Sequence, residues 1–389
     1  MMSGNERAYV SGIYEHPLRS APDKTVPQLH AEVARGALAD AGLGLGDVDA
    51  YFCAGDAPGL GGLSMAEYMG LRLRHVDTTE TGGPSYITHL NHAVRAIAAG
   101  KCRVALITLA GRPRAAKSSG KEARVYSADA PDLPYELPFD PSMVALYGMV
   151  AQRHMHEFGT TSEQLAWIKV AASQHAQHNP HARLPKAVSV DEVLASPIIS
   201  TPLHRLDCCV VTDGGGAIVV TAESIAQNLK QPRVRILGAA EAVKHQGGGR
   251  VDLTYSAAAQ AGAEAFAEAG VTPADIDYAS IYDSFTITAL LQLEDLGFCE
   301  KGGGGRFAAD GGLISGSGHL PFNTDGGGLC NNHPANRGGI TKIIEAVRQL
   351  RGTAQADVQV QDCELALASG IGGSLATRHS SAVAIFRRE

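Results

Sequence analysis

The sequence lacks the long apolar stretches that would place it in a membrane or in the secretory pathway. No apolar run in its 389 residues approaches the roughly 20 residues of a membrane-spanning helix. The first ten residues, MMSGNERAYV, contain no apolar core of the kind that secretory signals carry. We therefore predict a cytoplasmic location and no membrane partner.

An excess of positive charge is also missing. Lys and Arg number 33 against 40 Asp and Glu, which gives a formal net charge of −7. A general nucleic-acid-binding protein needs a basic surface, so we expect no nucleic-acid partner. The apolar fraction of 44% is ordinary for a globular protein, and the chain is long enough for two lobes.

Neither the cysteines nor the histidines form a pattern of metal ligands. The seven cysteines lack the paired spacing of a zinc site, and the adjacent Cys208 and Cys209 are badly placed for a structural bridge. His175 and His178 share a predicted helix face, but no cysteine or carboxylate pattern completes a site. We expect reduced thiols, no metal and no bound cofactor.

What the chain does contain is an internal repeat. Residues 31–50 (AEVARGALADAGLGLGDVDA) resemble residues 259–278 (AQAGAEAFAEAGVTPADIDY). Each copy predicts an Ala-rich amphipathic helix, a glycine that ends it, a short acidic turn and a strand. The predicted strands are 51–55 in the first copy and 278–285 in the second.

A second correspondence extends this repeat. The segments 93–100 (AVRAIAAG) and 345–352 (EAVRQLRG) predict helices that lead to apolar strands, and each follows a Gly-rich loop, 81–85 or 325–334. Duplicated strand–helix units predict an α/β fold with parallel sheets and helices on both faces. Pseudo-twofold symmetry should bring the two loops together at helix N-termini, where a developing anion is stabilised.

These repeats divide the chain into two predicted halves, residues 1–231 and 232–389. Residues about 113–205 interrupt the first half with basic, Pro-rich and His-rich stretches, and we expect this insertion to lie over the site. The first half resumes at 208–221 (CCVVTDGGGAIVVT), which predicts an apolar strand broken by a glycine turn.

Four motifs in this order resemble the thiolase superfamily, particularly its sterol-carrier and lipid-transfer-protein branch. They are LDCCVVTDGGGAIVV, SIYDSFTITALLQLEDLGFCEKGGGGRF, LPFNTDGGGLCNNHPANRGG and LALASGIGGSLA, and the resemblance covers nearly the whole chain. It implies the five-layer αβαβα thiolase fold, in which each half carries one βαβαβ repeat, and a homodimer.

The resemblance also shows which thiolase groups are missing. The nucleophilic cysteine of thiolases corresponds to Gly83, and their terminal acid/base cysteine corresponds to Ala368. Glycine and alanine cannot form a thioester or move a proton. The ordinary thiolase mechanism through an acyl-enzyme is therefore not available at these positions.

Two matching positions keep functional groups. His333 corresponds to the family histidine that holds the thioester oxygen, and Tyr282 stands where asparagine or histidine is usual. This arrangement resembles the lipid-transfer-protein aldolases, which cleave a carbon–carbon bond in a β-hydroxyacyl-CoA without an acyl-enzyme. Tyr282 also falls at the end of an apolar strand, where open α/β sheets place ligand-binding groups.

The two Gly-rich loops supply further candidates. Gly83, Ser85 and Gly328 are the predicted oxyanion or loop positions, and Ser85 is also a candidate helix cap. Cys330 is three residues before His333, so it is either a relocated nucleophile with a lowered pKa or a small buried thiol.

A basic stretch follows the first half's predicted strand. Arg112, Arg114 and Lys117 suit the phosphates of coenzyme A, although a solvated loop or a partner surface explains them equally well. Coenzyme A is expected as part of the substrate.

We therefore predict an acyl-CoA carbon–carbon lyase acting by retro-aldol cleavage. The related aldolases imply a small OB-fold partner of the DUF35 type. Two alternatives remain open. One is a Claisen-type acyltransferase that uses Cys330 or another displaced thiol, and the other is a non-catalytic acyl-CoA-binding subunit of a thiolase-like complex.

Overall fold

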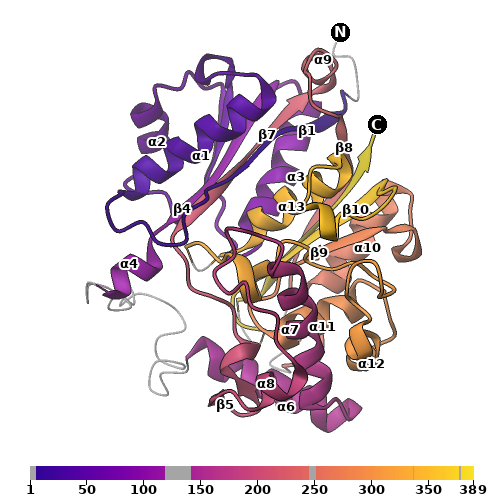
Figure 1. Ribbon diagram of the computed structural model, residues 1–389. Helices are drawn as coiled ribbons and strands as arrows, with labels where there is room; N and C mark the ends of the chain where they lie inside the picture. The colour runs from indigo at the N-terminus through magenta and orange to yellow at the C-terminus, as the bar shows by residue number, and fades with distance from the viewer. Residues whose placement is uncertain (1–5, 119–141, 245–250, 336, 376–377) are drawn as a thin grey trace.

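A computed structural model describes residues 6–118, 142–244, 251–335, 337–375 and 378–389 (Figure 1). One nine-stranded sheet runs through the described chain in the order β3-β2-β4-β7-β1-β8-β11-β10-β9. The two halves of the chain meet at β1 and β8, which pair through only two residue pairs, Tyr9 with Arg235 and Val10 with Val234.

The first half of the sheet is built from five strands and three helices. In chain order they are β1 (Ala8–Glu15), α1 (Val26–Ala41), β2 (Ala50–Phe52), α2 (Gly62–Met69), β3 (His75–Asp77), α3 (Ser85–Ala98), β4 (Val104–Gly111) and β7 (Gly214–Ala222). Apart from one threonine each, β4 and β7 consist of aliphatic residues and glycine, and both strands are buried along their whole length.

The second half repeats this order with different connections. Its elements are β8 (Val234–Val243), α10 (Ala258–Ala269), β9 (Tyr278–Ile281), α11 (Thr286–Asp295), α12 (Gly304–Ala308), α13 (Gly339–Arg351), β10 (Leu365–Gly372) and β11 (Ser380–Arg388). The predicted duplication is therefore visible as β1-α1-β2 against β8-α10-β9, and as α3-β4 against α13-β10.

The repeated helices end as the sequence predicts. Gly42 after α1 and Gly270 after α10 both adopt a left-handed conformation, with φ of 73° and 68°. This conformation costs glycine little, because glycine has no Cβ. The two copies thus turn toward their next strands in the same way.

Helices α3 and α13 form the central layer of the molecule. Helix α3 contacts β4 and β7 on one side and β8 and β11 on the other, while α13 contacts β9 and β10 as well as β1 and β7. In Figure 1, α1 and α2 cover one outer face and α10, α11 and α12 cover the other. The expected five-layer αβαβα thiolase fold is confirmed.

Two details differ from the prediction. The sheet is mixed, because β7 pairs antiparallel with β1 and β4, and β11 pairs antiparallel with β8 and β10. Residues 208–213 also form a loop, since the strand begins only at Gly214. Their backbone groups bond to loops of the second half, as in Cys209 N to Ser284 O and Val210 N to Gly328 O.

The described part of the insertion comprises α4 (Pro113–Ser118), α6 (Met143–Phe158), α7 (Ser162–Ala176), α8 (Val190–Leu194), β5 (Ile198–Ser200) and β6 (Leu203–His204). Helices α6 and α7 pack it against the second half, whereas α4 bonds to Asp213 of the first half. Helix α7 contacts α11, α12 and the glycine-rich segment Gly327–Asn331. None of the helices in the described ranges is long and apolar enough to cross a membrane.

Candidate active site

Tyr282 directly follows the last residue of β9, as the sequence predicts. Its backbone N–H donates to Ser369 O at 3.0 Å, and its carbonyl accepts from Gln292 Nε2 at 2.7 Å. These two bonds fix the backbone between β10 and α11, so the side chain has a defined direction. The residue is buried, with 4% of its surface exposed.

His333 faces Tyr282 from the second Gly-rich loop. The Tyr282 hydroxyl oxygen lies 2.8 Å from His333 Nε2, and the two rings meet edge to face. Burial, with a contribution from Lys342, lowers the pKa of His333 to about 3. Burial also raises the pKa of Tyr282 well above that of an exposed phenol. Both groups are therefore neutral near pH 7.

Gly83 lies against the same phenol from the first Gly-rich loop. A Cβ at Gly83 would lie 2.7 Å from the Tyr282 hydroxyl oxygen and 2.2 Å from the carbonyl oxygen of Ile371. A Cβ at Gly339, the first residue of α13, would lie 2.5 Å from the carbonyl oxygen of Gly83. The predicted approach of the two loops is confirmed, and Tyr282 fills the space beside the predicted cysteine position.

An ion pair across the loops is a further link between the halves. Arg337 Nη1 donates to both carboxylate oxygens of Glu80 at 2.6 Å. Glu80 in turn accepts from the backbone N–H groups of Gly82 and Gly55 at 2.7 and 2.6 Å. The segment just before Gly83 is thereby held against the segment that follows His333.

Asp283 binds the backbone of the second Gly-rich loop. Its carboxylate accepts from the backbone N–H groups of Gly328 at 2.8 Å and Leu329 at 3.1 Å. It also accepts from Lys342 Nζ at 2.7 Å, and both side chains are almost fully buried. These contacts give Asp283 a structural role, because they fix the backbone of the second loop.

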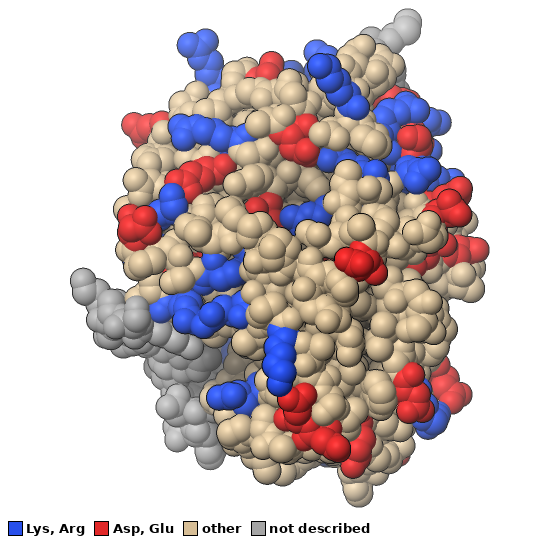
Figure 2. All heavy atoms as spheres, viewed as in Figure 1, with Lys and Arg blue, Asp and Glu red and all other residues tan. Residues whose placement is uncertain are grey.

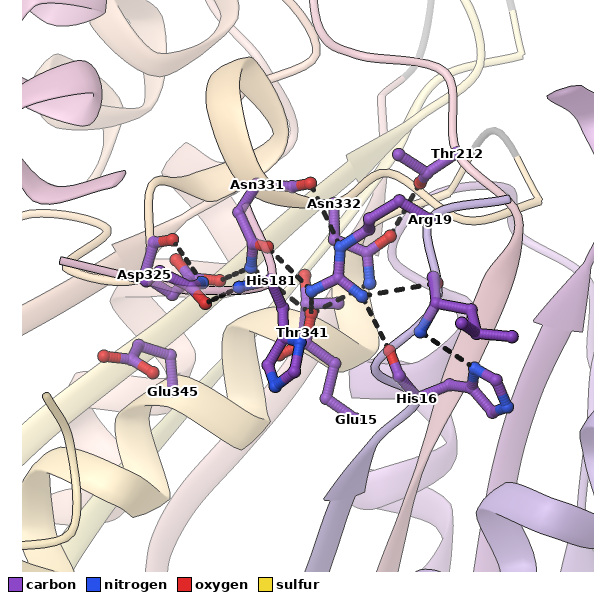
Figure 3. A network of polar contacts seen from close by, with 12 residues as sticks. Glu15, His16, Arg19, His181, Thr212, Asp325, Asn331, Asn332, Thr341 and Glu345 are labelled. Atoms are coloured by element: carbon purple, nitrogen blue, oxygen red, sulfur yellow. Dashed lines mark hydrogen bonds and ion pairs between the residues drawn. The ribbon is translucent and has the colours of Figure 1, made fainter. Parts of the chain in front are cut away.

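A second polar network anchors the same loop from the side of β1 (Figure 3). Arg19 donates to the side chain of Asn331 at 2.7 Å and to Glu15 at 2.8 Å, and Asn332 Nδ2 donates to Glu15 at 2.9 Å. Burial alone would raise the pKa of Glu15, but Arg19 and Arg348 bring it down to about 2. Glu15 therefore stays charged and fixes both asparagines before His333.

This network lines a polar cavity of about 250 Å³ next to the loop. Asp325 and Glu345 lie on its far side, where Asp325 accepts from Gly327 N and Asn331 Nδ2. Burial and the neighbouring Asp325 raise the pKa of Glu345 to about 7. The hydrogen bonds of Asp325, Arg19 and Glu15 here hold the loop in place.

Two of the predicted oxyanion donors are engaged within the protein. The N–H of Gly328 donates to Asp283, and the N–H of Ser85 donates to Gly82 O at 3.2 Å. Ser85 is also not the N-cap of α3, because it is the first helical residue and Pro84 precedes it. Its hydroxyl accepts from Thr81 N and donates to Gly82 O, so it closes the loop turn instead.

Cys330 is a buried thiol and not an activated one. It is fully buried, and its sulfur lies 3.1 Å from Nζ of Lys169, which also donates to Leu329 O. Burial raises the pKa of Cys330 despite this nearby lysine. The lowered pKa that a helix N-terminus predicts is absent, because α13 begins nine residues later at Gly339.

The predicted coenzyme A side chains lie at the end of β4 and in α4. The Arg112 guanidinium donates to the backbone oxygens of Lys24 and Pro22, and Arg114 is partly buried with its N–H donating to Asp213. The side chain of Lys117 lies outside the described residues. Figure 2 shows basic side chains gathered over this region, beside the grey segment, on a face where acidic and basic groups otherwise alternate.

Two site residues were not foreseen from the sequence. Cys209 places its sulfur 3.6 Å from His333 Nδ1, opposite to Tyr282. Tyr147 on α6 donates to Gly373 O at 3.2 Å, stacks near Phe285, and contributes to the raised pKa of Tyr282. The CC dipeptide before a glycine-rich strand was a signal for Cys209, whereas nothing local to α6 indicated Tyr147.

The comparisons with known proteins agree on one family. The family model described as thiolase C-terminal domain-like matches residues 240–388. An acetyl-CoA acetyltransferase of Methanothermobacter thermautotrophicus is 32% identical, over 97% of this chain and 99% of its own. A 17-hydroxy-3-oxo-4-pregnene-20-carboxyl-CoA lyase of Mycobacterium tuberculosis is 34% identical, over 91% of this chain and 93% of its own.

Solved structures extend this agreement to the fold. The structure titled Ltp2-ChsH2(DUF35) aldolase superposes with a TM-score of 0.89 at 31% identity, over 98% of both chains. Bovine sterol carrier protein 2 is 32% identical over 62% of this chain and 46% of its own length. The chain belongs to the thiolase superfamily, in the branch of the sterol-carrier-protein thiolase-like proteins.

Proposed function

We propose that this protein is an acyl-CoA carbon–carbon lyase that cleaves a β-hydroxyacyl-CoA by a retro-aldol reaction. One observation carries the proposal: the Tyr282 phenol, hydrogen-bonded to His333, occupies the space beside Gly83, where thiolases have their nucleophile. The neutral pair of Tyr282 and His333 thus takes the place of the nucleophilic cysteine that the thiolase resemblance puts at residue 83. Relatives named as a steroid-carboxyl-CoA lyase and a steroid side-chain-cleaving aldolase support the same reaction class.

In the proposed reaction the substrate's β-hydroxyl gives its proton to the Tyr282 oxygen. The Tyr282 proton moves at the same time to His333 Nε2, which lies 2.8 Å away. The β-oxygen forms a carbonyl, the bond between Cα and Cβ breaks, and its electron pair becomes the thioester enolate. The proton then returns to Cα, so the products are an aldehyde or ketone and a shortened acyl-CoA.

The low pKa of His333 is compatible with this relay. Burial and Lys342 disfavour the imidazolium of His333, so a full charge there is costly. The enolate's negative charge appears in the same step and offsets that cost. The first turn of α3, which begins at Ser85, provides the positive end of a helix dipole for the enolate oxygen.

The Claisen-type alternative has support from the relative named acetyl-CoA acetyltransferase, but it requires a thiol nucleophile. Cys330 is fully buried with a raised pKa, which argues against it in that role. A non-catalytic acyl-CoA-binding subunit is the other alternative, and it predicts no product at all.

Product analysis separates the three readings. The protein is mixed with a panel of β-hydroxyacyl-CoA and β-ketoacyl-CoA esters, with and without a DUF35-type partner, and both products and protein are analysed by mass spectrometry. We expect free aldehyde or ketone, shortened acyl-CoA and no covalent adduct. An acyl adduct on Cys330 would replace the lyase by an acyltransferase, and a bound ester without product would indicate a binding subunit.

We also propose a homodimer that forms along the free edge of β3. The edge strand β3 carries the exposed Val76, and the neighbouring α2 segment exposes Leu60, Leu63 and Tyr68. Exposed apolar groups next to an unpaired strand edge are typical of a protein–protein interface. A Leu63→Glu variant should shift the mass in solution, measured by light scattering, from dimer to monomer.

A DUF35-type OB-fold partner and a cytoplasmic location complete the proposal. The partner is supported by the solved aldolase complex whose title names DUF35. No disulfide joins the seven cysteines, all of which lie within the described residues, and this supports a reducing compartment. Coenzyme A enters as part of the substrate, with Arg112 and Arg114 as candidates for its phosphates.

A further inference from the structure

Cys209 lies on the side of the His333 ring opposite to Tyr282. Its sulfur is 3.6 Å from Nδ1, while the Tyr282 oxygen is 2.8 Å from Nε2. The thiol is fixed there by its backbone, because Cys209 N donates to Ser284 O at 2.9 Å. The next residue, Val210, donates to Gly328 O at 2.9 Å, so the loop 208–213 is tied to both sides of the site.

The backbone of His333 is held from the same loop. His333 N donates to Thr212 Oγ1 at 2.9 Å, and Thr212 Oγ1 donates to Asn332 Oδ1 at 2.6 Å. Main chain and ring are therefore both fixed, and the ring cannot turn without losing a contact at each nitrogen.

A neutral imidazole has one N–H and one lone pair, so two arrangements are possible around His333. In the first, the thiol donates to Nδ1 and Nε2–H donates to the phenol oxygen. In the second, Nδ1–H donates to the Cys209 sulfur and the phenol donates to Nε2. The second pairs the phenol, a far better donor than a thiol, with the imidazole lone pair, the best acceptor present.

We infer that Cys209 is a positioning residue that fixes His333 as the tautomer protonated on Nδ1. This inference rests on the proposed function, because it assigns Nε2 as the atom that receives the proton of Tyr282. The bond at one ring nitrogen decides the proton on the other. With its own proton directed at Nε2, the Tyr282 oxygen presents lone pairs to the substrate's hydroxyl.

The opposite tautomer would work against the proposed reaction. Nε2–H would then point at Tyr282, and the phenol would become a donor toward the substrate rather than an acceptor. Without the sulfur, the buried Nδ1–H would lose its acceptor, a cost that the other tautomer avoids, so the population would divide between the two tautomers. The expected consequence is a lower turnover with unchanged substrate binding.

The tautomer is measured directly by nitrogen-15 NMR on protein labelled at histidine. The signals of His333 are identified as those that disappear in the His333→Gln variant. In the wild type at pH 7.5 we expect a protonated Nδ1 and a lone pair on Nε2. Cys209→Ala should show a mixed population and a kcat about 10–100-fold lower with KM unchanged, by analogy with metal-bound histidines that lose their hydrogen-bond partner. Cys209→Ser should restore the tautomer and most of kcat.

The neighbouring thiol is a matched control. The Cys208 thiol donates to His204 O at 3.4 Å and not to His333, so Cys208→Ala should change neither the tautomer nor kcat. A protonated Nε2 in the wild type, or an unchanged tautomer in Cys209→Ala, would overturn the inference. The NMR measurement needs no substrate, so it stands even if the lyase assay fails.

Discussion

The phenol of Tyr282 packs so closely against the backbone of Gly83 that no room is left for a side chain at residue 83. A Cβ built on Gly83 would lie 2.7 Å from both the ring carbon Cζ and the hydroxyl oxygen of Tyr282. A cysteine at residue 83 and a tyrosine at residue 282 therefore exclude each other in this backbone.

The first prediction is that any side chain at residue 83 destabilises the protein. Gly83→Ala should lower the free energy of unfolding by about 1–3 kcal/mol, because its Cβ meets the Ile371 carbonyl and the Tyr282 ring. Urea denaturation measures the change. Gly46→Ala is the control, since no atom lies within 4 Å of its Cβ position. Equal effects of the two substitutions would contradict the steric argument.

The second prediction concerns the Tyr282 hydroxyl. Tyr282→Phe should retain the fold and lower kcat of the lyase reaction by about 10²–10⁴-fold, because the substrate's proton loses its acceptor. Tyr51→Phe is the control. It removes another buried hydroxyl, which is hydrogen-bonded to Thr108 Oγ1 at 2.7 Å and not to a site residue, and it should keep full activity. Wild-type turnover in Tyr282→Phe would exclude the phenol from the chemistry.

A third prediction tests the buried pair of Lys342 and Asp283. Lys342→Met leaves the carboxylate of Asp283 buried with only backbone partners, which should cost about 3–5 kcal/mol of unfolding free energy. Lys186→Met breaks an exposed ion pair with Glu192 and should change the stability little. If both variants lose the same unfolding free energy in urea, the buried pair of Lys342 and Asp283 does not stabilise the fold as predicted.

The fourth prediction concerns the pH dependence of stability through Glu345. Its pKa is raised from 4.5 to about 7, so the folded protein binds this proton more tightly than the unfolded chain does. Stability therefore falls as pH rises from about 4.5 to about 7, with a slope of at most about 1.4 kcal/mol per pH unit.

Replacing Glu345 by glutamine removes this titration. Glu345→Gln should show a flatter dependence of the unfolding free energy between pH 4.5 and 7, measured by urea denaturation at several pH values. Its Thr324 contact at 2.6 Å can be kept by the amide oxygen. Curves that stay parallel to the wild type throughout this range would assign the titration to another group.

The sequence by itself determined the duplication and supplied the candidates for the site. The helix periodicity, the terminating glycines and the apolar strands are local properties, so they predicted α1, α10, β4 and β10 without knowledge of any contact. The approach of the two Gly-rich loops followed from symmetry. Tyr282 and His333 followed from their motifs.

Only the tertiary structure decided what surrounds those positions. The valines of 208–213 predicted a strand, but these residues lie between two loops and bond to Ser284 and Gly328 instead. That placement brings the Cys209 sulfur to His333 Nδ1, and the packing of α6 brings Tyr147 against Phe285 and Gly373 O. Local patterns carry no information about such contacts, because they join segments far apart in the chain that meet only after the sheet and the insertion have packed.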